Sequence, residues 1–422
     1  MKSNSDEAAG EFKAGVIRDF HDHVSSGKVR FWQQYGMDIV MGRREGCFFW
    51  DLDESRRFFN LHCNGGVFNF GHRHPVLVET LKAALDDLDI GNGHLISRAR
   101  AELGRALAEA MPGDLDYAVF GASGGEAVDT AFKVARAYTG KTRIVSARGG
   151  YHGHTGLAMA AGDEKYRAPF GPPAPGFLQV PFNDLEAMNR AVDADTAAVV
   201  LETVPATLGM PLPDADYLPA LRRLCDRQGA VLILDEVQTG LGRTGRLWGF
   251  EHFNVLPDIV VVAKGLSGGL YPITATVLRR PLERVFHPDP HIHVSTFGGA
   301  EVGCRVALKV MEMSSAPAFL DHVNRLAALF AAGTAGLIAR YPILKELRQL
   351  GLFMGLRFQD ERCGPLMSAA AFHHGLFMVY ANNDPSVSQL LPPLVMDLDQ
   401  VDWVMERLAF SLADVQTMLG GG

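Results

Sequence analysis

The chain has 422 residues, 47% of them hydrophobic and 21% charged, a composition that excludes a disordered protein and predicts two or three domain-sized lobes. Its net charge of −8 argues against nucleic acid or an anionic membrane surface as the main partner. Five widely spaced cysteines without a CxxC motif argue against a disulfide framework. The N-terminus lacks the apolar core of a signal peptide, and no apolar run is long enough for a bilayer, so we expect a cytoplasmic protein outside the membrane.

The first three quarters of the chain predict an α/β fold. Residues 1–30 are polar and favour helix or loose chain, and short strand-like runs such as 47–51 follow. Apolar residues at helical spacing predict helices over 76–87, 98–110 and 126–138. The predicted strands are the apolar runs 117–120, 143–146, 197–201, 230–234 and 258–263. Short apolar strands that alternate with helices indicate a mostly parallel sheet buried on both faces.

The last hundred residues follow another pattern. A long helix is predicted over 318–340, strands around 352–358 and 379–380, and a final helix over 399–418. These elements do not alternate as the earlier ones do. The tail is therefore expected to form an α+β lobe beside the α/β lobe.

One glycine-rich turn, Phe120-Gly-Ala-Ser-Gly-Gly-Glu126, follows a predicted strand and opens a predicted helix. Free backbone N–H groups and the helix dipole at such a place suit an anion such as phosphate, and Ser123 adds a donor. The glycines do not have the G-x-G-x-x-G spacing of a dinucleotide fingerprint. An ordinary tight strand–helix turn is the alternative for this segment taken alone.

Two strand ends carry the remaining candidate chemistry. The run Leu232–Leu234 delivers Asp235, Glu236 and Gln238 to its carboxyl end, where open parallel sheets bind ligands. A carboxylate there would pair with a cation, such as the protonated ring nitrogen of a cofactor; a strand-end cap is the alternative. The run 258–263 ends on Lys264, which could form a Schiff base or simply extend to solvent.

Three histidine pairs have i, i+2 spacing, which would place each pair on one face of a strand. No carboxylate cluster accompanies them at metal-ligand spacing, so we predict no metal site. The pairs are His72/His74, His152/His154 and His291/His293.

The stretch LDEVQTGLGRTGRL at 234–247, followed by Lys264, resembles the class III (omega-type) aminotransferases, which are pyridoxal-5′-phosphate (PLP) enzymes of fold type I. The resemblance runs from about residue 30 to 410 and includes the turns at 70–75, 123–127, 151–153 and 295–299. It implies a large PLP-binding α/β domain over 76–317 and a small domain built from 1–75 and 318–422. It also implies a homodimer with composite active sites.

The resemblance also implies roles for individual residues. Lys264 would hold the cofactor as a Schiff base and move a proton, and Asp235 would pair with the pyridine nitrogen. Gln238 would bind the phenolic oxygen, with Val237 and Tyr151 on opposite faces of the ring. The other implied cofactor contacts are Ser123, Gly124, Gly125, His152, Glu202 and Thr296, the last from the second subunit.

Several positions depart from the family's pattern, and they concern the substrate. Where many relatives have arginines that grip carboxylates, this chain has His154 and Gln389, and Gln cannot supply a charged bidentate fork. Gly125 stands where Thr is frequent, and the loop 202–209 is altered. The candidate substrate contacts are Asn64 with its neighbour Cys63, Arg43, Arg44, Arg73, His154 and Gln389.

Three functions remain open from the sequence. The first is an aminotransferase that moves an amino group from a primary amine or omega-amino acid to a keto acid. The second is a lyase on the same cofactor that eliminates ammonia or phosphate from a phospho- or phosphono-amine. The third is a catalytically dead relative, against which the intact set of Lys264, Asp235 and Gln238 argues.

Overall fold

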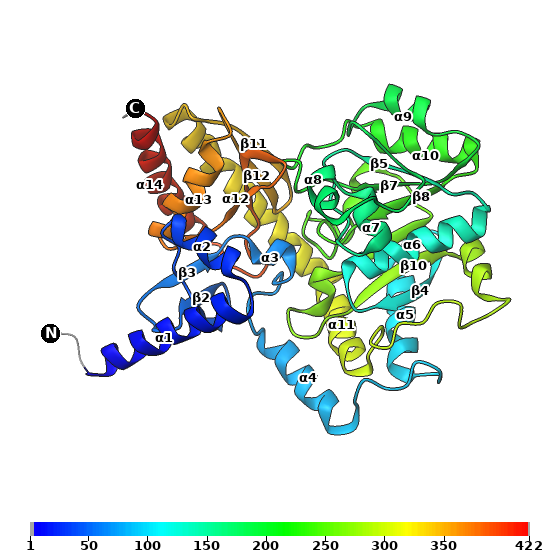
Figure 1. Cartoon of the computed structure of the whole chain (residues 1–422), viewed down its shortest axis with the longest axis horizontal. Helices are drawn as coiled ribbons and strands as arrows, with labels where there is room; N and C mark the ends of the chain where they lie inside the picture. Colours follow the sequence, from blue (N-terminus) through cyan, green and yellow to red (C-terminus); the bar gives the residue numbers. More distant parts are fainter. Residues whose placement is uncertain (1–3, 421–422) are drawn as a thin grey trace.

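A seven-stranded sheet forms the centre of the larger lobe in the computed structural model, which describes residues 4–420 (Figure 1). Its strand order is β4-β10-β9-β8-β7-β5-β6, and every strand except β10 runs in the same direction. The strands are β4 (Leu115–Gly121), β5 (Arg143–Ala147), β6 (Phe177–Val180), β7 (Thr196–Glu202), β8 (Val231–Asp235), β9 (Ile259–Val262) and β10 (Thr274–Arg279).

Helices cover both faces of this sheet, because its central strands are apolar on both sides. Every residue of β7, β8 and β9 is buried. One face packs against α6 (Gly124–Thr139) and α7 (Gly156–Ala161), and the other against α5 (Arg98–Ala110), α10 (Tyr217–Gln228) and α11 (Glu301–Ser314). The remaining helices of this region are α4 (Pro75–Asp87), α8 (Glu164–Arg167), η1 (Ala168–Phe170), α9 (Leu185–Ala191), η2 (Gly249–Phe253), η3 (Lys264–Ser267) and η4 (Arg280–Phe286).

The two ends of the chain share the second lobe, where blue N-terminal and orange-to-red C-terminal segments lie together in Figure 1. One sheet has the order β1-β2-β3-β13 and the other β11-β12-β15-β14. The N-terminal elements are α1 (Asn4–His23), α2 (Ser26–Gln34), β1 (Met41–Glu45), β2 (Phe48–Asp51), β3 (Arg57–Asn60) and α3 (Cys63–Gly66). The C-terminal elements are α12 (Pro317–Arg340), β11 (Leu344–Leu350), β12 (Phe353–Phe358), α13 (Cys363–His373), β13 (Leu376–Phe377), β14 (Val379–Ala381), β15 (Asp384–Leu390) and α14 (Gln400–Gly420).

Pairing and packing join the two ends. Leu376 of β13 pairs in parallel with Phe59 of β3, and Phe59 and Leu61 lie in one apolar core with Leu326 and Leu408. Burial of such side chains contributes roughly 1.5–3 kcal/mol each, so neither end is expected to hold this core alone. Domain boundaries near 75/76 and 317/318 stay our proposal.

The predicted α/β fold is confirmed, and most predicted helices and strands lie within a few residues of those observed. The sequence patterns did not single out β6, β10 and β15. Residues 1–3 of the predicted N-terminal helical stretch lie outside the described residues. No helix within residues 4–420 is both long and apolar enough to cross a membrane.

Candidate active site

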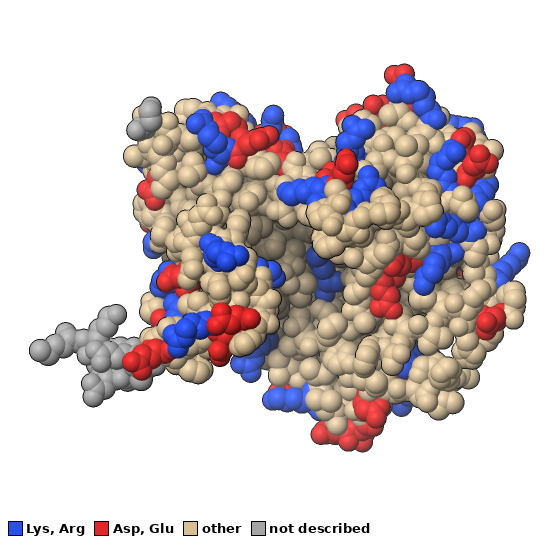
Figure 2. Space-filling view, in the orientation of Figure 1, with Lys and Arg blue, Asp and Glu red and all other residues tan. Residues whose placement is uncertain are grey.

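Two adjoining cavities lie where the parallel strands end, and Figure 2 shows the molecule hollowed between its two lobes. The first cavity, of about 650 Å³, is lined by the residues after β4, β5, β7, β8 and β9. The second, of about 420 Å³, lies against α2, α3 and the C-terminal elements α13, β14 and β15 of the second lobe. Tyr151, Thr207, Gln238 and Lys264 line both, so a ligand in one would meet a ligand in the other.

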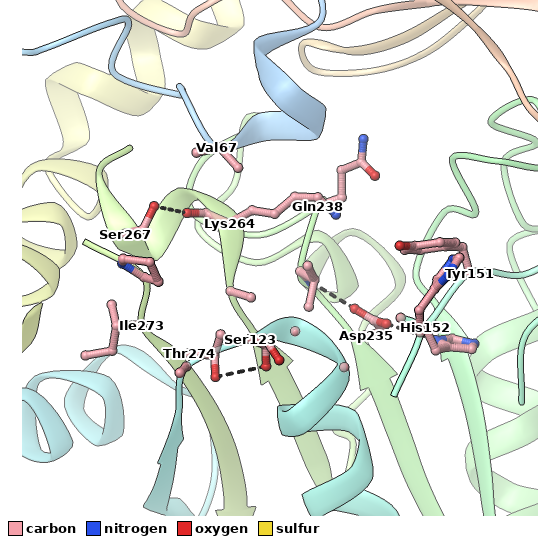
Figure 3. Close-up of a pocket in the computed structure, with 18 of the residues that line it drawn as sticks. Val67, Ser123, Tyr151, His152, Asp235, Gln238, Lys264, Ser267, Ile273 and Thr274 are labelled. Carbon is pink, nitrogen blue, oxygen red and sulfur yellow. Dashed lines mark hydrogen bonds and ion pairs between the residues drawn. The ribbon is translucent and has the colours of Figure 1, made fainter. Parts of the chain in front are cut away.

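Lys264 lies at the junction of the cavities, two residues after the end of β9 (Figure 3). Its backbone has a φ of 38°, an uncommon conformation for a residue with a side chain, and Ser267 Oγ donates to its carbonyl at 2.7 Å. Burial lowers the pKa of the Lys264 ammonium, although the charges of Asp235 and Glu202 oppose the shift. A larger fraction of its amine is therefore neutral and nucleophilic than in an exposed lysine.

Asp235 ends β8 and faces the first cavity while only 5% exposed. Its two carboxylate oxygens interact with His152 Nδ1 at 2.9 Å and with the Val237 N–H at 3.1 Å. Burial lowers the pKa of His152, but the hydrogen bond and charge of Asp235 outweigh burial and raise it overall. His152 Nε2 is buried and has no hydrogen-bond partner among the described residues.

Two further carboxylates at the strand ends have different surroundings: Glu202, the last residue of β7, and Glu236, the first residue after β8. Glu202 lines the first cavity and accepts from the backbone N–H groups of Tyr151 at 2.9 Å and Ala206 at 3.2 Å. Burial raises its pKa to about 7. Glu236 lies outside the cavity lining and accepts from the N–H of Gly249 at 2.7 Å and of Phe250 at 3.0 Å. Glu236 therefore binds the N-terminus of η2, and of the two carboxylates at the end of β8 it is Asp235 that faces the cavity.

The glycine-rich turn forms one wall of the first cavity at the N-terminus of α6. Ser123 caps the helix by accepting from the Glu126 N–H at 3.2 Å, and Glu126 accepts from the Ala122 N–H at 2.8 Å. A Cβ at Gly125 would lie 2.8 Å from Thr155 Oγ1, so the Thr155 side chain fills the space that a larger residue 125 would need. An anion at this wall would meet free N–H groups and the positive end of the helix dipole.

The remaining predicted cofactor contacts fall into two groups. Tyr151, Val237 and Gln238 line the first cavity, and the Tyr151 ring packs against His154 with centroids 5.2 Å apart. Thr296 is different, because it is exposed on the segment before α11 and does not line the first cavity of its own chain. A role for Thr296 would thus require a second subunit.

Some of the predicted substrate contacts line a cavity of this chain and others do not. Asn64 and Gln389 line the second cavity, and His154 lines the first. Cys63 is fully buried and lines neither cavity.

The three arginines Arg43, Arg44 and Arg73 line neither cavity of this chain, and a substrate contact from any of them stays a prediction. The Arg43 guanidinium lies 3.9 Å from the Trp50 ring centroid, and Arg44 donates to the Gly42 carbonyl at 3.1 Å. Arg73 is exposed, with a φ of 51°. The physical reason is that strand β1, which carries Arg43 and Arg44, directs most of its side chains to solvent.

Sequence reasoning missed several cavity residues. Thr155, Ser267 and Thr274 line the first cavity, and Trp32, Tyr35 and Tyr380 line the second. Thr155 is the second residue after the Tyr151–Gly153 motif, which was a usable signal. The aromatic residues near position 32 gave none, because only the tertiary fold brings α2 to the strand ends of the other lobe.

Comparison with known proteins assigns the family. The family model "Aminotransferase class-III" matches residues 32–412, and the chain belongs to this family. The chain is 55% identical over 397 residues to an uncharacterized aminotransferase of Archaeoglobus fulgidus, covering 94% of this chain and 93% of that protein. The resemblance inferred from the sequence is therefore confirmed, and the chain is a PLP-dependent transaminase of fold type I.

Solved structures agree with this assignment. The ornithine aminotransferase of Toxoplasma gondii superposes with a TM-score of 0.84 at 25% identity, over 99% of each chain, and its structure holds PLP at partial occupancy in the active site. An (S)-enantioselective omega-transaminase of Thermomicrobium roseum gives a TM-score of 0.86 at 27% identity, over 98% of this chain and 100% of the other. The family and these relatives imply PLP as the cofactor and do not favour the lyase alternative.

Proposed function

We propose that this chain binds PLP in the first cavity and transfers the amino group of a primary amine or omega-amino acid to a keto acid. The observation that carries the proposal is the convergence of a lysine, a buried carboxylate and a helix N-terminus on one cavity. PLP needs partners for its aldehyde, its ring nitrogen and its phosphate. Lys264, Asp235 and the turn Ser123–Gly125 are of the chemical types that fit these three groups.

The chain's own atoms have separate tasks in this proposal. When bound, PLP supplies an aldehyde and a ring that accepts electrons. Lys264 Nζ would hold the aldehyde and would take and return the proton of the substrate carbon. Asp235 would keep a proton on the ring nitrogen, and His152 Nδ1, 2.9 Å away, holds the Asp235 carboxylate in place. Gln238 would serve the phenolic oxygen, and the Tyr151 ring would pack against the cofactor.

Asn64, His154 and Gln389 are the proposed substrate contacts. Glu202 is proposed to lie near cofactor and substrate, where its raised pKa keeps part of it uncharged at neutral pH. The substrate contacts proposed within one chain do not include Arg43, Arg44 or Arg73.

A homodimer is also proposed, with Thr296 of one subunit at the phosphate of the other. The exposure of Thr296 and of the neighbouring apolar residues Ile292, Val294 and Phe297 supports this proposal. A symmetric pair of such patches would bury them and bring each Thr296 to a second chain.

A half-reaction tests the function. The PLP-loaded protein is mixed with single amines in the absence of a keto acid, and both the spectrum of the cofactor and released ammonia are followed. A transaminase converts one equivalent of cofactor, stops, and restarts when a keto acid is added. Release of ammonia over many turnovers without an acceptor would instead identify a lyase.

Lys264→Ala provides the matched control for this experiment. It should abolish the half-reaction and the covalent retention of PLP, while the circular dichroism spectrum stays that of the wild type. Full activity of Lys264→Ala would remove the basis of the proposal and revive the binding-protein alternative.

A further inference from the structure

Aromatic and apolar side chains build one side of the second cavity. The end of α2 contributes Phe31, Trp32 and Tyr35, and the Phe31 ring lies 5.1 Å, between centroids, from each of the other two. Met378 and Tyr380, from the C-terminal part of the second lobe, complete this side. Such a surface gains free energy by covering an apolar or aromatic group, roughly 25 cal/mol for each Å² removed from water.

Apart from the basic residues Lys264 and His62, the polar side chains that line this cavity are neutral. They are amides and hydroxyls, and of the described residues that line the cavity none is an arginine or a carboxylate. The polar lining consists of Asn64, Thr207, Ser368, Asn382, Gln238 and Gln389. Figure 2 agrees with this composition, since uncharged residues form most of the visible hollow.

Two basic side chains do line the second cavity, but neither suits a substrate carboxylate. Lys264 is occupied by the cofactor under the proposed function. Burial, together with the charge of Lys264, lowers the pKa of His62 to about 4, so its ring is uncharged at neutral pH. A carboxylate in this cavity would therefore lose its water without gaining a cationic partner from this chain.

Gln389 is the residue best placed to decide between charged and uncharged ligands. It lies on β15, opposite Gly355 of β12 and Val379 of β14, and is 6% exposed. Because β12 and β14 pair with β15 on either side of Gln389, its backbone is held in place and its side chain starts from a defined position at the cavity wall. An amide there can donate a hydrogen bond but supplies no charge.

We propose that the amino donor is an uncharged arylalkyl or bulky alkyl amine, whose apolar group occupies the second cavity, and that Gln389 selects against donors that carry a carboxylate. This inference rests on the proposed function and names its substrate class. The donor R₂CH–NH₂ becomes the ketone R₂C=O with oxygen from water, and the amino group passes to the acceptor carbonyl, which releases that water. The donor carbon is oxidised and the acceptor carbon is reduced by the same two electrons, so the keto acid is the only oxidant that the reaction needs.

A matched pair of amines tests the inference with the PLP-loaded enzyme. 1-Phenylethylamine and 3-amino-3-phenylpropanoate share the phenyl ring and the reacting carbon, and the second differs only by an added carboxylate. We expect the rate constant of the half-reaction, divided by the half-saturating concentration, to be on the order of 100-fold higher for the uncharged amine. Equal or faster reaction of the carboxylated amine would overturn the inference.

Two variants at position 389 separate charge from shape. Gln389→Arg should reduce the preference for the uncharged amine at least tenfold by accelerating the carboxylated one, because Arg offers a bidentate partner. Gln389→Met keeps the length without charge and should retain the preference. Unchanged ratios in Gln389→Arg would show that residue 389 does not select the substrate.

The aromatic wall has its own matched variants. Trp32→Ala should raise the half-saturating concentration of 1-phenylethylamine about tenfold, because a large apolar contact is lost. Phe410→Ala, at an exposed aromatic residue of α14, should leave it unchanged. Equal effects of the two variants on this concentration would show that the second cavity does not bind the apolar group of the donor.

The outcomes also distinguish this inference from the function on which it rests. If the carboxylated amine reacts and the uncharged one does not, transamination stands and only the substrate class is wrong. If neither compound nor any omega-amino acid converts the cofactor, the proposed function fails and the inference fails with it.

Discussion

The contact between Gly65 and Lys264 makes a sharp prediction. Gly65 has a φ of 69°, and a Cβ built on it would lie 2.9 Å from Lys264 Cε and 3.5 Å from Gln238 Nε2. Carbon atoms pack at roughly 3.5–4.0 Å, so Gly65→Ala must displace the Lys264 side chain by about 1 Å. The Ala side chain also makes the left-handed backbone less stable by about 1–2 kcal/mol.

The two effects can be separated with a second glycine. Gly140 ends α6 with a φ of 68°, and a Cβ there would have no heavy atom within 4 Å. Gly140→Ala should therefore cost the same backbone energy without touching the site. Misplacing a reacting group by about 1 Å can slow a reaction about 100-fold. We expect that loss in Gly65→Ala alone, with similar urea midpoints in both variants.

Two assays measure the effect on Lys264. The first is the rate of the half-reaction, and the second is trapping of Lys264 with PLP and borohydride, read from the mass of its peptide. Gly65→Ala should slow both, and Gly140→Ala neither. Equal rates in the two variants would refute the argument that Gly65 exists to make room for the lysine.

Three further predictions concern the first cavity. Asp235→Ala should lower the transamination rate by orders of magnitude with the fold intact, as circular dichroism would verify; unchanged turnover would exclude a protonated ring nitrogen. Glu202 binds its proton more tightly in the folded state, where its pKa is about 7, than at the ordinary 4.5. The contribution of Glu202 to the free energy of unfolding therefore falls by up to about 3 kcal/mol as pH rises from 4.5 to 7. Glu202→Gln should make the urea midpoint less dependent on pH over this range. An unchanged pH dependence of the urea midpoint in Glu202→Gln would contradict this prediction. Gly125→Thr should weaken PLP binding at equilibrium, since its Cβ would meet Thr155, and Thr155→Ala should restore it; no rescue would count against that contact.

Much of this protein follows from its sequence, because local patterns record local constraints. Apolar runs such as 197–201 and 258–263 can be stable only as strands covered on both faces, and the turn at 120–126 can only join a strand to a helix. The stretch 234–247, followed by Lys264, was specific enough to identify the family from the sequence alone.

The tertiary structure decided what depends on distant contacts. The strand pattern by itself does not distinguish Asp235 from Glu236; the family resemblance favoured Asp235, and the structure shows that Glu236 is directed away from the cavity toward Thr203 and η2. The sequence made Arg43 a candidate for binding an anion. The structure shows its guanidinium on β1, 3.9 Å from the centroid of the Trp50 ring.

The second cavity is the clearest case. Its wall joins α2 and α3 to β15, which lies more than three hundred residues further along the chain. The sequence determined the chemistry at the strand ends, because each strand delivers its own last residues there. The structure alone decided which set of side chains lines the second cavity, because that choice depends on how two lobes built from distant segments pack together.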